Sequence, residues 1–330
     1  MPPHTKVTII GFGKLGQALA HVLEEKKEEC VVSGWNTSDT KHPQQEPEIA
    51  RALDHAAVIF IAVPSANFKK AVDASAPHIP EDALIITGTK GFDGTTGKLP
   101  VEVLEDAFPR HTTGVLSGPM LAKELDEGLP TKATLASRDI EHLKPIQKLF
   151  AGTRLSLELS DDTVGVSLYG ILKNVYALAL GLSDGLELGA NFKSCIALKA
   201  IREMMHIVCA NGGSQDTIFT EAGLGDFFTT GFSPKSRNYT YGFNLGAETH
   251  HDRQNVGVIH ELPLQAVRHE LPPLAEGVKN IERVITLAPN QENTPLLRGI
   301  HKIFIQSKDP RDTLLRVFKE NFRSSTSGMG

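Results

Sequence analysis

The feature that most restricts the fold is the alternation of short apolar runs with helical stretches in the first half of the chain. The apolar runs are rich in Val and Ile and cover residues 6–11, 30–35, 57–63, 83–88 and 112–118. Short, nearly continuous runs of this kind are typical of strands covered on both faces. Two further segments, 132–137 and 153–159, are expected to add edge strands. The pattern predicts an α/β fold with a doubly wound parallel sheet.

The strand pattern ends near residue 160, and the rest of the chain has the pattern of helices. Ser160 and Asp161 are plausible N-caps for the first of them. We expect two domains, residues 1–160 and residues 161–330, with a ligand site in the cleft between them. The expected helices cover residues 162–183, 191–211, 256–269, 275–288, 295–306 and 310–321.

Composition excludes several classes of function. A net charge of -5 gives no reason to expect nucleic acid or an acidic membrane as the main partner. The three cysteines form no C-x-x-C pair, and the histidines lack metal-ligand spacing, so neither a disulfide framework nor a metal site is predicted. The first residues lack the pattern of a signal peptide, and we expect a cytoplasmic protein.

Residues 163–183 form a run that is long and apolar enough to cross a bilayer. Lys173 lies near its centre, where a charge costs roughly 2.5–3.5 kcal/mol even on a lenient insertion scale. No second run of this kind, aromatic belt or basic flank accompanies it. We therefore expect a buried helix of a soluble protein and no membrane span.

A glycine-rich loop follows the first expected strand and opens the first expected helix. The segment "IIGFGKLGQALA" contains G-x-G-x-x-G as Gly11, Gly13 and Gly16. In this context the first glycine permits a tight turn, the second lets the backbone approach a pyrophosphate, and the third allows close helix–strand packing. The free N–H groups of the helix favour phosphate. A nicotinamide dinucleotide is predicted here, bordered also by Phe12, Lys14 and Leu15.

The choice of cofactor depends on the end of the second strand. An NAD site usually has an acidic residue there to bind the ribose 2′-hydroxyl, but Asn36 occupies the position. Asp39 is the first carboxylate, and Lys41 and His42 follow it. An uncharged turn backed by a cation favours NADP over NAD. Alternatively, Asn36 is only a turn residue, and both cofactors are accepted.

Lys173 is the only charged residue between Asp162 and Asp184. Gly170 and Ala177 lie one turn away on the same helix face and are expected to leave room above its side chain. Burial lowers the pKa of a lysine, which suits proton transfer near neutral pH. Lys173 is therefore a candidate proton donor in carbonyl reduction. The structural alternative is a lysine paired with a buried carboxylate.

A second set of polar residues lies in "EAGLGDFFTTGFSPKSRNYTYG", residues 221–242, which we expect to be rich in loops. Arg237 can bind a phosphate or carboxylate with two parallel hydrogen bonds. Asp226 can orient a substrate hydroxyl or pair with Lys173. Lys90 follows a strand and so lies at the edge of the sheet where ligands bind. Together these residues predict an anion-binding cleft beside a dinucleotide.

With these segments in place, the chain resembles a known family, the NAD(P)-dependent glycerol-3-phosphate dehydrogenases of the soluble bacterial type, over nearly its whole length. The most specific segments are the Lys-Asn helix, G-L-G-D and S-R-N. The segments that carry the resemblance, in chain order, are "GFGKLGQALA", "VPS", "TKG", "SGP" with "AKEL", "VGVSLYGILKNVYALALGLSDGLELGAN", "AGLGDFFTT", "SPKSRN" and "AEGVKN".

The resemblance implies a Rossmann domain followed by an all-helical domain, an NAD(P)-dependent oxidoreductase acting on CH–OH, and a homodimer. It implies reduction of dihydroxyacetone phosphate to sn-glycerol 3-phosphate for phospholipid synthesis. Lys173, Lys90 and Asp226 correspond to catalytic positions. The substrate positions are Lys90, Gly118, Asn174, Asp226, Thr230, Ser236, Arg237 and Asn238. The cofactor positions outside the glycine loop are Asn36, Pro64, Lys90, Ala122, Arg237 and Glu276.

The chain departs from the family pattern in four places. Met120 stands where the family usually has Ser or Thr, with Leu121 after it, and Asn36 stands where Arg or His is common. The loop 36–55 is shorter, and "SRNYT" replaces the more basic "SRNRR". Met120 favours a second hypothesis, a related dehydrogenase of another small hydroxy acid. A third is a non-catalytic dinucleotide sensor, which would not need the lysines.

Overall fold

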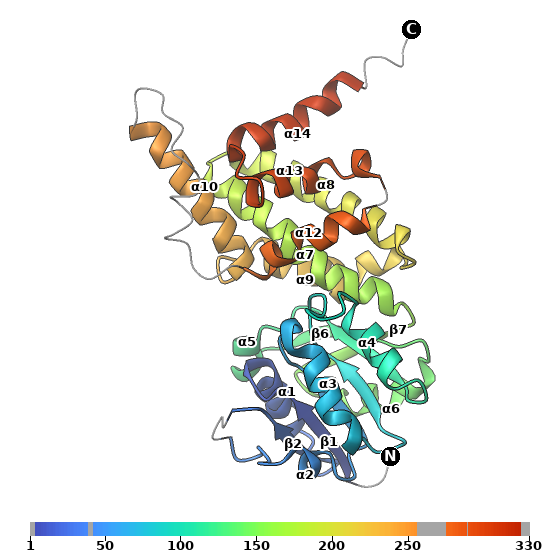
Figure 1. Cartoon of the computed structure of the whole chain (residues 1–330). Coiled ribbons are helices and arrows are strands. Elements are labelled where there is room, and N and C mark those ends of the chain that lie inside the picture. Colours follow the sequence, from blue (N-terminus) through green and yellow to red (C-terminus); the bar gives the residue numbers. More distant parts are fainter. Residues whose placement is uncertain (1–3, 39–41, 256–274, 289, 325–330) are drawn as a thin grey trace. The chain divides into compact units, whose positions relative to one another are not determined.

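The computed structural model describes residues 4–38, 42–255, 275–288 and 290–324 (Figure 1). The helix expected at 256–269 lies outside the described residues. The chain forms two compact units. The first unit comprises Met1–Gly170 and Phe219–Asp226, and the second comprises Ile171–Ile218 and Phe227–Gly330. The expected domain boundary at residue 160 stays a prediction.

The first unit is built on a seven-stranded sheet with the order β2-β1-β3-β4-β5-β6-β7. All neighbouring pairs are parallel except β5 and β6. The doubly wound sheet is therefore confirmed, with one antiparallel pair. The strands are β1 (Thr5–Ile10), β2 (Cys30–Trp35), β3 (Val58–Ile61), β4 (Leu84–Thr87), β5 (Thr113–Ser117), β6 (Thr131–Ala136) and β7 (Leu155–Ser160).

The two late strands were both expected at an edge, and this was right for β7 and wrong for β6. β7 pairs in parallel with the outer side of β6, which places β6 inside the sheet. The six paired positions run from Thr131 opposite Leu155 to Ala136 opposite Ser160. Alternating apolar positions do not distinguish an edge strand from its neighbour, because both have the same two-residue period.

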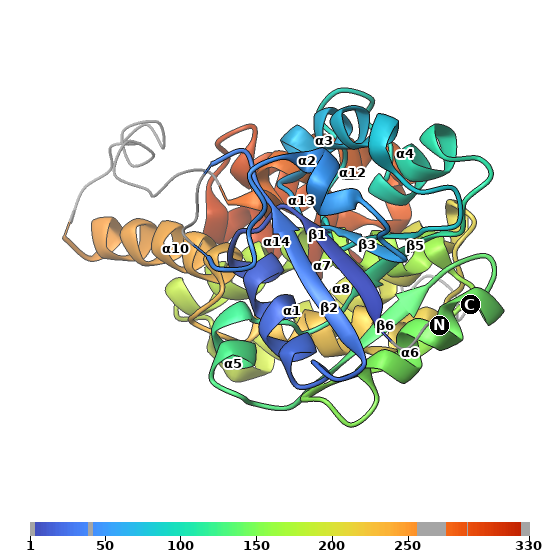
Figure 2. The same ribbon diagram turned by 90° about the horizontal axis from the view of Figure 1, so that it is seen from below.

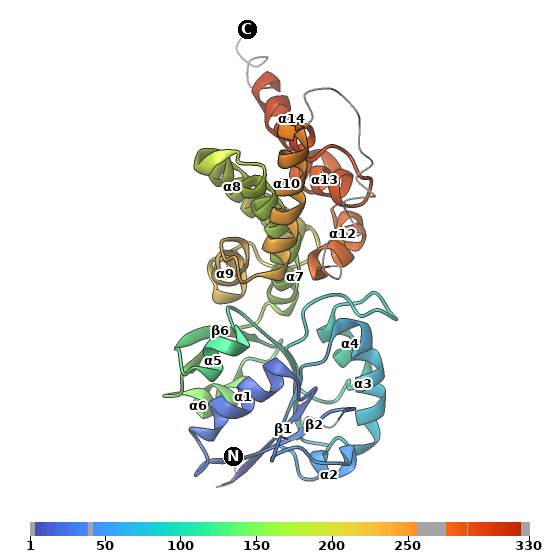
Figure 3. The ribbon, with the colours of Figure 1, turned by 90° about the vertical axis from the view of Figure 1, so that its left-hand side faces the viewer.

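Helices cover both faces of this sheet (Figures 2 and 3). Successive strand residues point to opposite faces, so Ile9 packs in one apolar cluster and Ile10 in the other. Each face therefore has its own core. One face carries α1 (Lys14–Glu24), α5 (Ala122–Asp126) and α6 (Lys144–Phe150). The opposite face carries α2 (Ile49–Leu53), α3 (Phe68–Ser75) and α4 (Pro100–Ala107).

The strand order reverses at β1, which pairs with β2 on one side and with β3 on the other. In open α/β sheets, ligands bind outside the carboxyl ends of the strands at such a switch point. Gly11 follows β1 and Pro64 follows β3 shortly after its end. The topology therefore brings these two predicted cofactor residues to the favoured edge.

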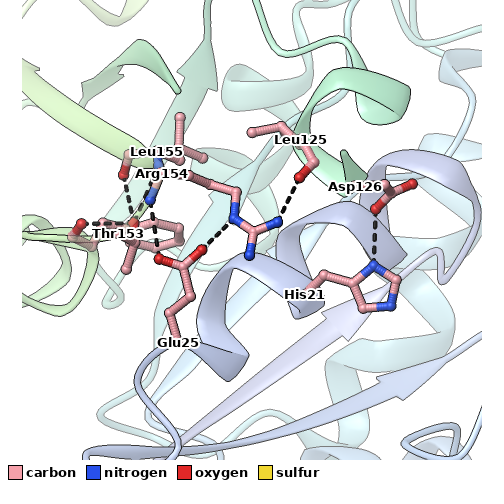
Figure 4. A network of polar contacts seen from close by, with 8 residues as sticks. His21, Glu25, Leu125, Asp126, Thr153, Arg154 and Leu155 are labelled. Atoms are coloured by element: carbon pink, nitrogen blue, oxygen red, sulfur yellow. Dashed lines mark hydrogen bonds and ion pairs between the residues drawn. The ribbon is translucent and has the colours of Figure 1, made fainter. Parts of the chain in front are cut away.

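Polar contacts hold α1, the helix that follows the glycine loop (Figure 4). The Glu25 carboxylate after this helix accepts hydrogen bonds from the backbone N–H of Arg154, at 3.2 Å, and from its guanidinium. The same guanidinium donates to the carbonyl of Leu125 at 2.8 Å. His21 contacts Asp126 at 2.9 Å. These contacts attach α1 to α5 and to the chain leading into β7.

The second unit is helical. The expected helices are confirmed wherever their residues are described, but α10 was not expected. The start of α10 falls in the polar stretch 221–242, whose sequence predicts loops. The helices of the second unit are α7 (Thr163–Gly185), α8 (Gly189–Ala210), α9 (Asp226–Gly231), α10 (Arg237–Asn255), α12 (Glu276–Leu287), α13 (Pro295–Phe304) and α14 (Pro310–Ser324). The first residues of α7 and α9 belong to the first unit.

Tertiary packing explains why α10 is a helix. A side chain on Gly181 of α7 would overlap the backbone carbonyl of Tyr239 in α10. A side chain on Gly242 of α10 would likewise overlap the carbonyl of Leu178 in α7. Gly185 and Gly246 repeat the same close approaches one turn further on. Because small residues let two helix backbones approach closely, packing along α7 overrides the weak helix propensity of this segment.

The most apolar helix is buried in the structure. α7 is long and apolar enough to cross a membrane, but 94% of its apolar window is buried inside the protein. Asp162 caps it, because its Oδ1 accepts the backbone N–H of Gly165 at 2.7 Å. The expectation that Ser160 or Asp161 would cap this helix was wrong, because the helix begins one residue later, at Thr163.

Candidate active site

The three glycines of the loop differ in their surroundings. Gly11 has a φ of +90°, which favours glycine, and a side chain there would lie 2.6 Å from the carbonyl oxygen of Ala62. A side chain at Gly16 would overlap the carbonyl oxygen of Gly11. Beside Gly13 there is open space: apart from its two chain neighbours, no described residue has an atom within 4 Å of the point that a Cβ would occupy. The backbone is therefore exposed where a pyrophosphate would approach.

The residues at the start of α1 fit a dinucleotide. Gly13 is the N-cap of this helix, and no side chain in the described part of the structure caps it, so its first N–H groups remain available. Lys14 is exposed and Leu15 is half-buried at this end. Pro64 is exposed after β3, and Ala122 begins α5. The uncapped start of α1 is therefore suited to a phosphate group, and the assignment of these residues to the cofactor stays a prediction.

Phe12 is placed differently from the other residues of the loop. Its ring is fully buried, packed against Gly34 and edge-on to His42, with ring centroids 4.8 Å apart. Its backbone N–H donates to the carbonyl of Trp35 at 3.3 Å. The Phe12 ring therefore packs beneath the turn. Sequence spacing alone does not distinguish such a packing residue from one that contacts a ligand.

Asn36 binds within its own turn. Its side-chain amide donates to Ser38 Oγ at 3.0 Å. Asp39 and Lys41, on which the expectation of NADP partly depends, lie outside the described residues. His42 accepts the backbone N–H of Gln44 on Nδ1, and burial followed by the nearby His21 lowers its pKa. A neutral His42 adds no fixed positive charge beside this turn.

Lys90 and Asp226 form an ion pair in the first unit, although they are 136 positions apart in the sequence. Lys90 Nζ lies 2.6 Å from Asp226 Oδ2 and 3.0 Å from the carbonyl oxygen of Gly118. The Asp226 side chain is 3% exposed and that of Lys90 is 21% exposed. Three predicted substrate residues thus meet at the carboxyl edge of the sheet.

A short segment carries Asp226 to this edge. Residues Phe219–Asp226 pack in the first unit, with helical segments before and after them. The backbone N–H of Ala222 donates to Thr134 Oγ1 in β6 at 3.2 Å, and Lys132 lies 3.2 Å from Glu221. This anchoring explains how Asp226, the first residue of α9, reaches Lys90.

The stretch 221–242, expected to be rich in loops, is helical over much of its length, as η5 (Glu221–Gly225), α9 and the start of α10.

Lys173 is buried in the second unit with a polar partner. Its side chain is 6% exposed, and Nζ donates to Thr230 Oγ1 in α9 at 2.7 Å. The room expected beside Gly170 is occupied, since a side chain there would lie 2.8 Å from Ser117 Oγ and 3.8 Å from Lys90 Cγ. Gly170 therefore allows close packing against β5 and Lys90.

Asn174 belongs to a buried amide relay that connects three helices. Asn238 Nδ2 in α10 donates to Asn174 Oδ1 in α7 at 2.9 Å. Asn238 Oδ1 accepts the backbone N–H of Gly277 in α12 at 2.8 Å, directly after Glu276. Both asparagine side chains are buried. The relay sets the relative positions of α7 and of the first turns of α10 and α12.

Ser236 and Arg237 lie at the start of α10. Ser236 Oγ accepts the backbone N–H of Tyr239 at 3.3 Å and so caps the helix. Its hydroxyl hydrogen is not used in that bond and can still donate. Arg237 is exposed at the first helical position. An exposed guanidinium, a serine hydroxyl and a helix N-terminus together suit an anionic group.

Met120 packs in the apolar core of the first unit. It is 9% exposed and belongs to the cluster under α1, α5 and α6. Its backbone N–H donates to the carbonyl of Gly118 at 2.9 Å. Burial in the core accounts for a methionine at this position, which removes the main argument for a different hydroxy acid.

Glu203 is a buried carboxyl that sequence reasoning missed. It accepts the backbone N–H groups of Leu296 and Leu297 at 2.7 and 2.9 Å, and the Tyr176 hydroxyl at 3.0 Å. Burial raises its pKa from 4.5 to about 7, against the lowering effect of these hydrogen bonds. An acidic residue between apolar helix positions was the available signal. Glu203 thus connects α8 with α13 and with α7, the helix that carries Lys173.

A doubly wound sheet with an open glycine turn after its first strand is typical of dinucleotide-binding domains. The models of the NAD-dependent glycerol-3-phosphate dehydrogenase N-terminus and C-terminus match residues 40–143 and 162–315. The chain belongs to this family.

Individual relatives agree over most of the chain. The glycerol-3-phosphate dehydrogenase [NAD(P)+] of Ectopseudomonas mendocina is 33% identical over 92% of this chain and 91% of its own length. The crystal structure of glycerol-3-phosphate dehydrogenase from Coxiella burnetii has a TM-score of 0.80 and 29% identity, covering 96% of this chain and 99% of that one. The Plasmodium falciparum enzyme, at 22% identity and a TM-score of 0.82, shares the fold over 95% of both chains.

Proposed function

We propose that this chain catalyses the reversible NAD(P)H-dependent reduction of dihydroxyacetone phosphate to sn-glycerol 3-phosphate. The observation that carries the proposal is the buried Lys173 ammonium, hydrogen-bonded to Thr230, in a member of this family. A buried lysine near a hydroxyl suits proton transfer to a carbonyl oxygen. The reduced nicotinamide supplies the hydride when it is bound.

The catalytic roles follow from the charges of the side chains. Lys173 protonates the oxygen that becomes the new hydroxyl. Lys90 places positive charge opposite the developing oxyanion, where a fixed cation is worth most. Asp226 holds the Lys90 ammonium and orients a substrate hydroxyl. The Gly118 carbonyl accepts a further hydrogen bond from the Lys90 ammonium and so helps to hold it in place.

The remaining polar residues bind and orient the substrate. Arg237, Ser236 and the N–H groups at the start of α10 hold the phosphate. Asn174, Asn238 and Thr230 fix the geometry of that helix end and of the lysine. Gly11, Gly13 and Gly16 hold the pyrophosphate of the cofactor. The other residues assigned to the cofactor are Phe12 through its backbone, Lys14, Leu15, Asn36, Pro64, Lys90, Ala122, Arg237 and Glu276.

NADP is our preferred cofactor over NAD, because the described residues at the end of β2, Asn36–Ser38, include no carboxylate to repel a 2′-phosphate. The ratio of NADPH to NADH oxidation measures this preference. A strong preference for NADH would mean that Asn36 acts only as a turn residue.

The decisive experiment is the rate of NADPH and NADH oxidation by the purified protein with dihydroxyacetone phosphate. We expect turnover in the wild type and a loss of about 10²- to 10⁴-fold in kcat for Lys173→Ala, the range for general acid catalysis. Cofactor binding should change little. Lys193→Ala is the matched control, since this half-buried lysine pairs with Asp184 in the same unit. Cofactor binding without turnover would support the sensor hypothesis instead.

Three broader properties complete the proposal. We expect action in the cytoplasm, supported by the free thiols of Cys30, Cys195 and Cys209. The product supplies the backbone of glycerophospholipids. The protein is a homodimer, which sedimentation at micromolar concentration tests directly. A monomer at that concentration would contradict the last point without affecting the reaction.

A further inference from the structure

One buried hydroxyl at the carboxyl end of β5 has no hydrogen-bond partner among the described residues. Ser117, the last residue of β5, is 2% exposed, and its Oγ makes no hydrogen bond to any residue that the structure describes. Leaving a buried hydroxyl unpaired costs free energy, and most such groups in proteins are paired. An exception of this kind calls for a specific reason.

Other buried hydroxyls of the same sheet follow the usual rule. Ser137 Oγ, just after β6, donates to the carbonyl of Thr113 at 2.7 Å. Thr8 Oγ1 in β1 donates to the carbonyl of Ala52 at 2.6 Å. Thr134 Oγ1 in β6 accepts the backbone N–H of Ala222. The sheet therefore pairs its hydroxyls readily, and Ser117 stands apart from these three.

Ser117 lies beside the groups proposed for the reaction. It precedes Gly118, whose carbonyl accepts a hydrogen bond from the Lys90 ammonium. A side chain at Gly170 would lie 2.8 Å from Ser117 Oγ and 3.8 Å from Lys90 Cγ, so the hydroxyl and the lysine stem border the same point of α7. The Ser117 hydroxyl therefore lies close to the Lys90 side chain.

We infer that Ser117 is a further substrate-binding residue, whose hydroxyl has no partner among the described residues and hydrogen-bonds to a carbonyl or hydroxyl oxygen of the bound triose phosphate. The inference rests on the proposed function. Substrate oxygens draw the Lys90 ammonium away from the Gly118 carbonyl, and the hydroxyl then gains a partner. A buried hydroxyl without a hydrogen bond costs free energy, and a ligand that supplies the missing bond removes this cost. The hydroxyl therefore favours binding of that ligand.

Ser117→Ala tests the inference because its two expected effects have opposite signs. Removing an unpaired hydroxyl should raise Tm by about 1–3 °C. The same change should lower kcat/KM for dihydroxyacetone phosphate about three- to tenfold, the range for one neutral hydrogen bond, with KM for the cofactor unchanged. The rise in Tm produced by saturating glycerol 3-phosphate should also be smaller in the variant.

Thr294→Val is the matched control. Thr294 is fully buried at the start of α13, and its Oγ1 likewise has no hydrogen-bond partner among the described residues. This variant should gain stability in the same way and keep the wild-type kcat/KM. It separates the effect of removing an unpaired hydroxyl from the effect of removing this particular one.

Three outcomes overturn the inference. A Ser117→Ala variant that is more stable but equally active would make the hydroxyl a packing defect. A variant that loses stability and activity together would make it a structural group. A wild type that neither turns over dihydroxyacetone phosphate nor binds glycerol 3-phosphate would remove the proposed function and the inference with it. Wild-type turnover with either of the first two results removes the inference alone.

Discussion

At the scale of single residues, two Lys–Asp pairs of equal length differ in their surroundings. Lys90–Asp226 and Lys98–Asp106 both have Nζ–Oδ2 distances of 2.6 Å. The Asp226 side chain is 3% exposed, whereas that of Asp106 is 60% exposed. Exposed pairs contribute about 0–1 kcal/mol, but removing one member of a buried pair leaves an uncompensated charge. The two pairs therefore predict different consequences of the same mutation.

Asp226→Asn should lower kcat/KM for dihydroxyacetone phosphate on the order of 100-fold, because Lys90 loses the carboxylate that fixes its ammonium. Steady-state kinetics with NADPH or NADH as cofactor measures the effect. Asp106→Asn is the control and should stay within about twofold of the wild type. Equal effects of the two substitutions would show that burial of the Asp226 pair is irrelevant to the reaction.

At the scale of secondary structure, α7 is positioned by two kinds of contact. Gly181 and Gly185 let α10 approach its backbone on one side. Tyr176 donates to Glu203 of α8, which also caps the start of α13. Lys173 lies within one turn of Tyr176 on the same helix. The orientation of the proposed proton donor therefore depends on backbone packing and on one buried carboxyl.

Gly242→Ala tests the backbone packing. The added methyl group would overlap the carbonyl oxygen of Leu178, and a backbone oxygen cannot rotate away. We expect the free energy of unfolding to fall by about 1–3 kcal/mol, and kcat/KM to fall because α10 carries Arg237. Denaturant unfolding measures the first effect. Gly88→Ala, where the nearest atom is Leu15 Cδ2 at 3.6 Å, should change stability far less. Equal losses would refute the packing argument.

Glu203 predicts a pH dependence of stability. Its pKa rises from 4.5 to about 7 in the folded protein, so the folded state binds this proton more tightly than the unfolded chain does. The contribution of Glu203 to the free energy of unfolding is therefore highest at acid pH. It falls as the pH rises from about 4.5 to about 7 and is constant above that range.

Glu203→Gln should remove this contribution, and unfolding of both proteins at several pH values between about 5 and about 8 measures it. The groups that face the carboxyl are the Tyr176 hydroxyl, whose pKa burial raises well above its ordinary value, the Lys199 ammonium, and the amides of Leu296 and Leu297. The difference in stability between wild type and variant should become less favourable to the wild type as pH rises. A difference independent of pH would contradict the assignment.

At the scale of the whole molecule, the proposed ligand groups are divided between the two units. The glycine loop, Lys90 and Asp226 belong to the first unit, and Lys173 and Arg237 belong to the second. Each unit has its own polar network, Lys90–Asp226–Gly118 in one and Asn174–Asn238–Gly277 in the other. In the proposed reaction, the first unit binds the pyrophosphate of the cofactor and the second unit binds the phosphate of the substrate.

Hydrogen exchange with and without ligands tests this division of labour. NADPH alone should slow amide exchange in residues 11–16. Glycerol 3-phosphate added to the protein with NADP⁺ should further slow exchange in residues 237–240, where the helix N-terminus is proposed to hold the phosphate. Protection confined to the first unit with both ligands present would refute the assignment of the phosphate to α10.

Sequence patterns alone were enough to predict the elements whose pattern is local. Val/Ile runs predicted the parallel strands because burial on both faces requires apolar residues throughout. The spacing of Gly11, Gly13 and Gly16 predicted the turn because glycine is favoured at each of these positions for a separate reason: Gly11 and Gly16 pack against backbone atoms, and Gly13 leaves its backbone open. The apolar run around Lys173 predicted a buried helix. Motif order along the chain also sufficed to identify the family.

Which distant residues meet is visible only in the folded structure. It paired Lys90 with Asp226, made α10 a helix through glycine contacts with α7, and buried Met120 in the core. It also left Ser117 without a partner among the described residues. The physical reason is that such contacts depend on how whole elements pack, whereas residue spacing along the chain records only which face of its own element each side chain occupies.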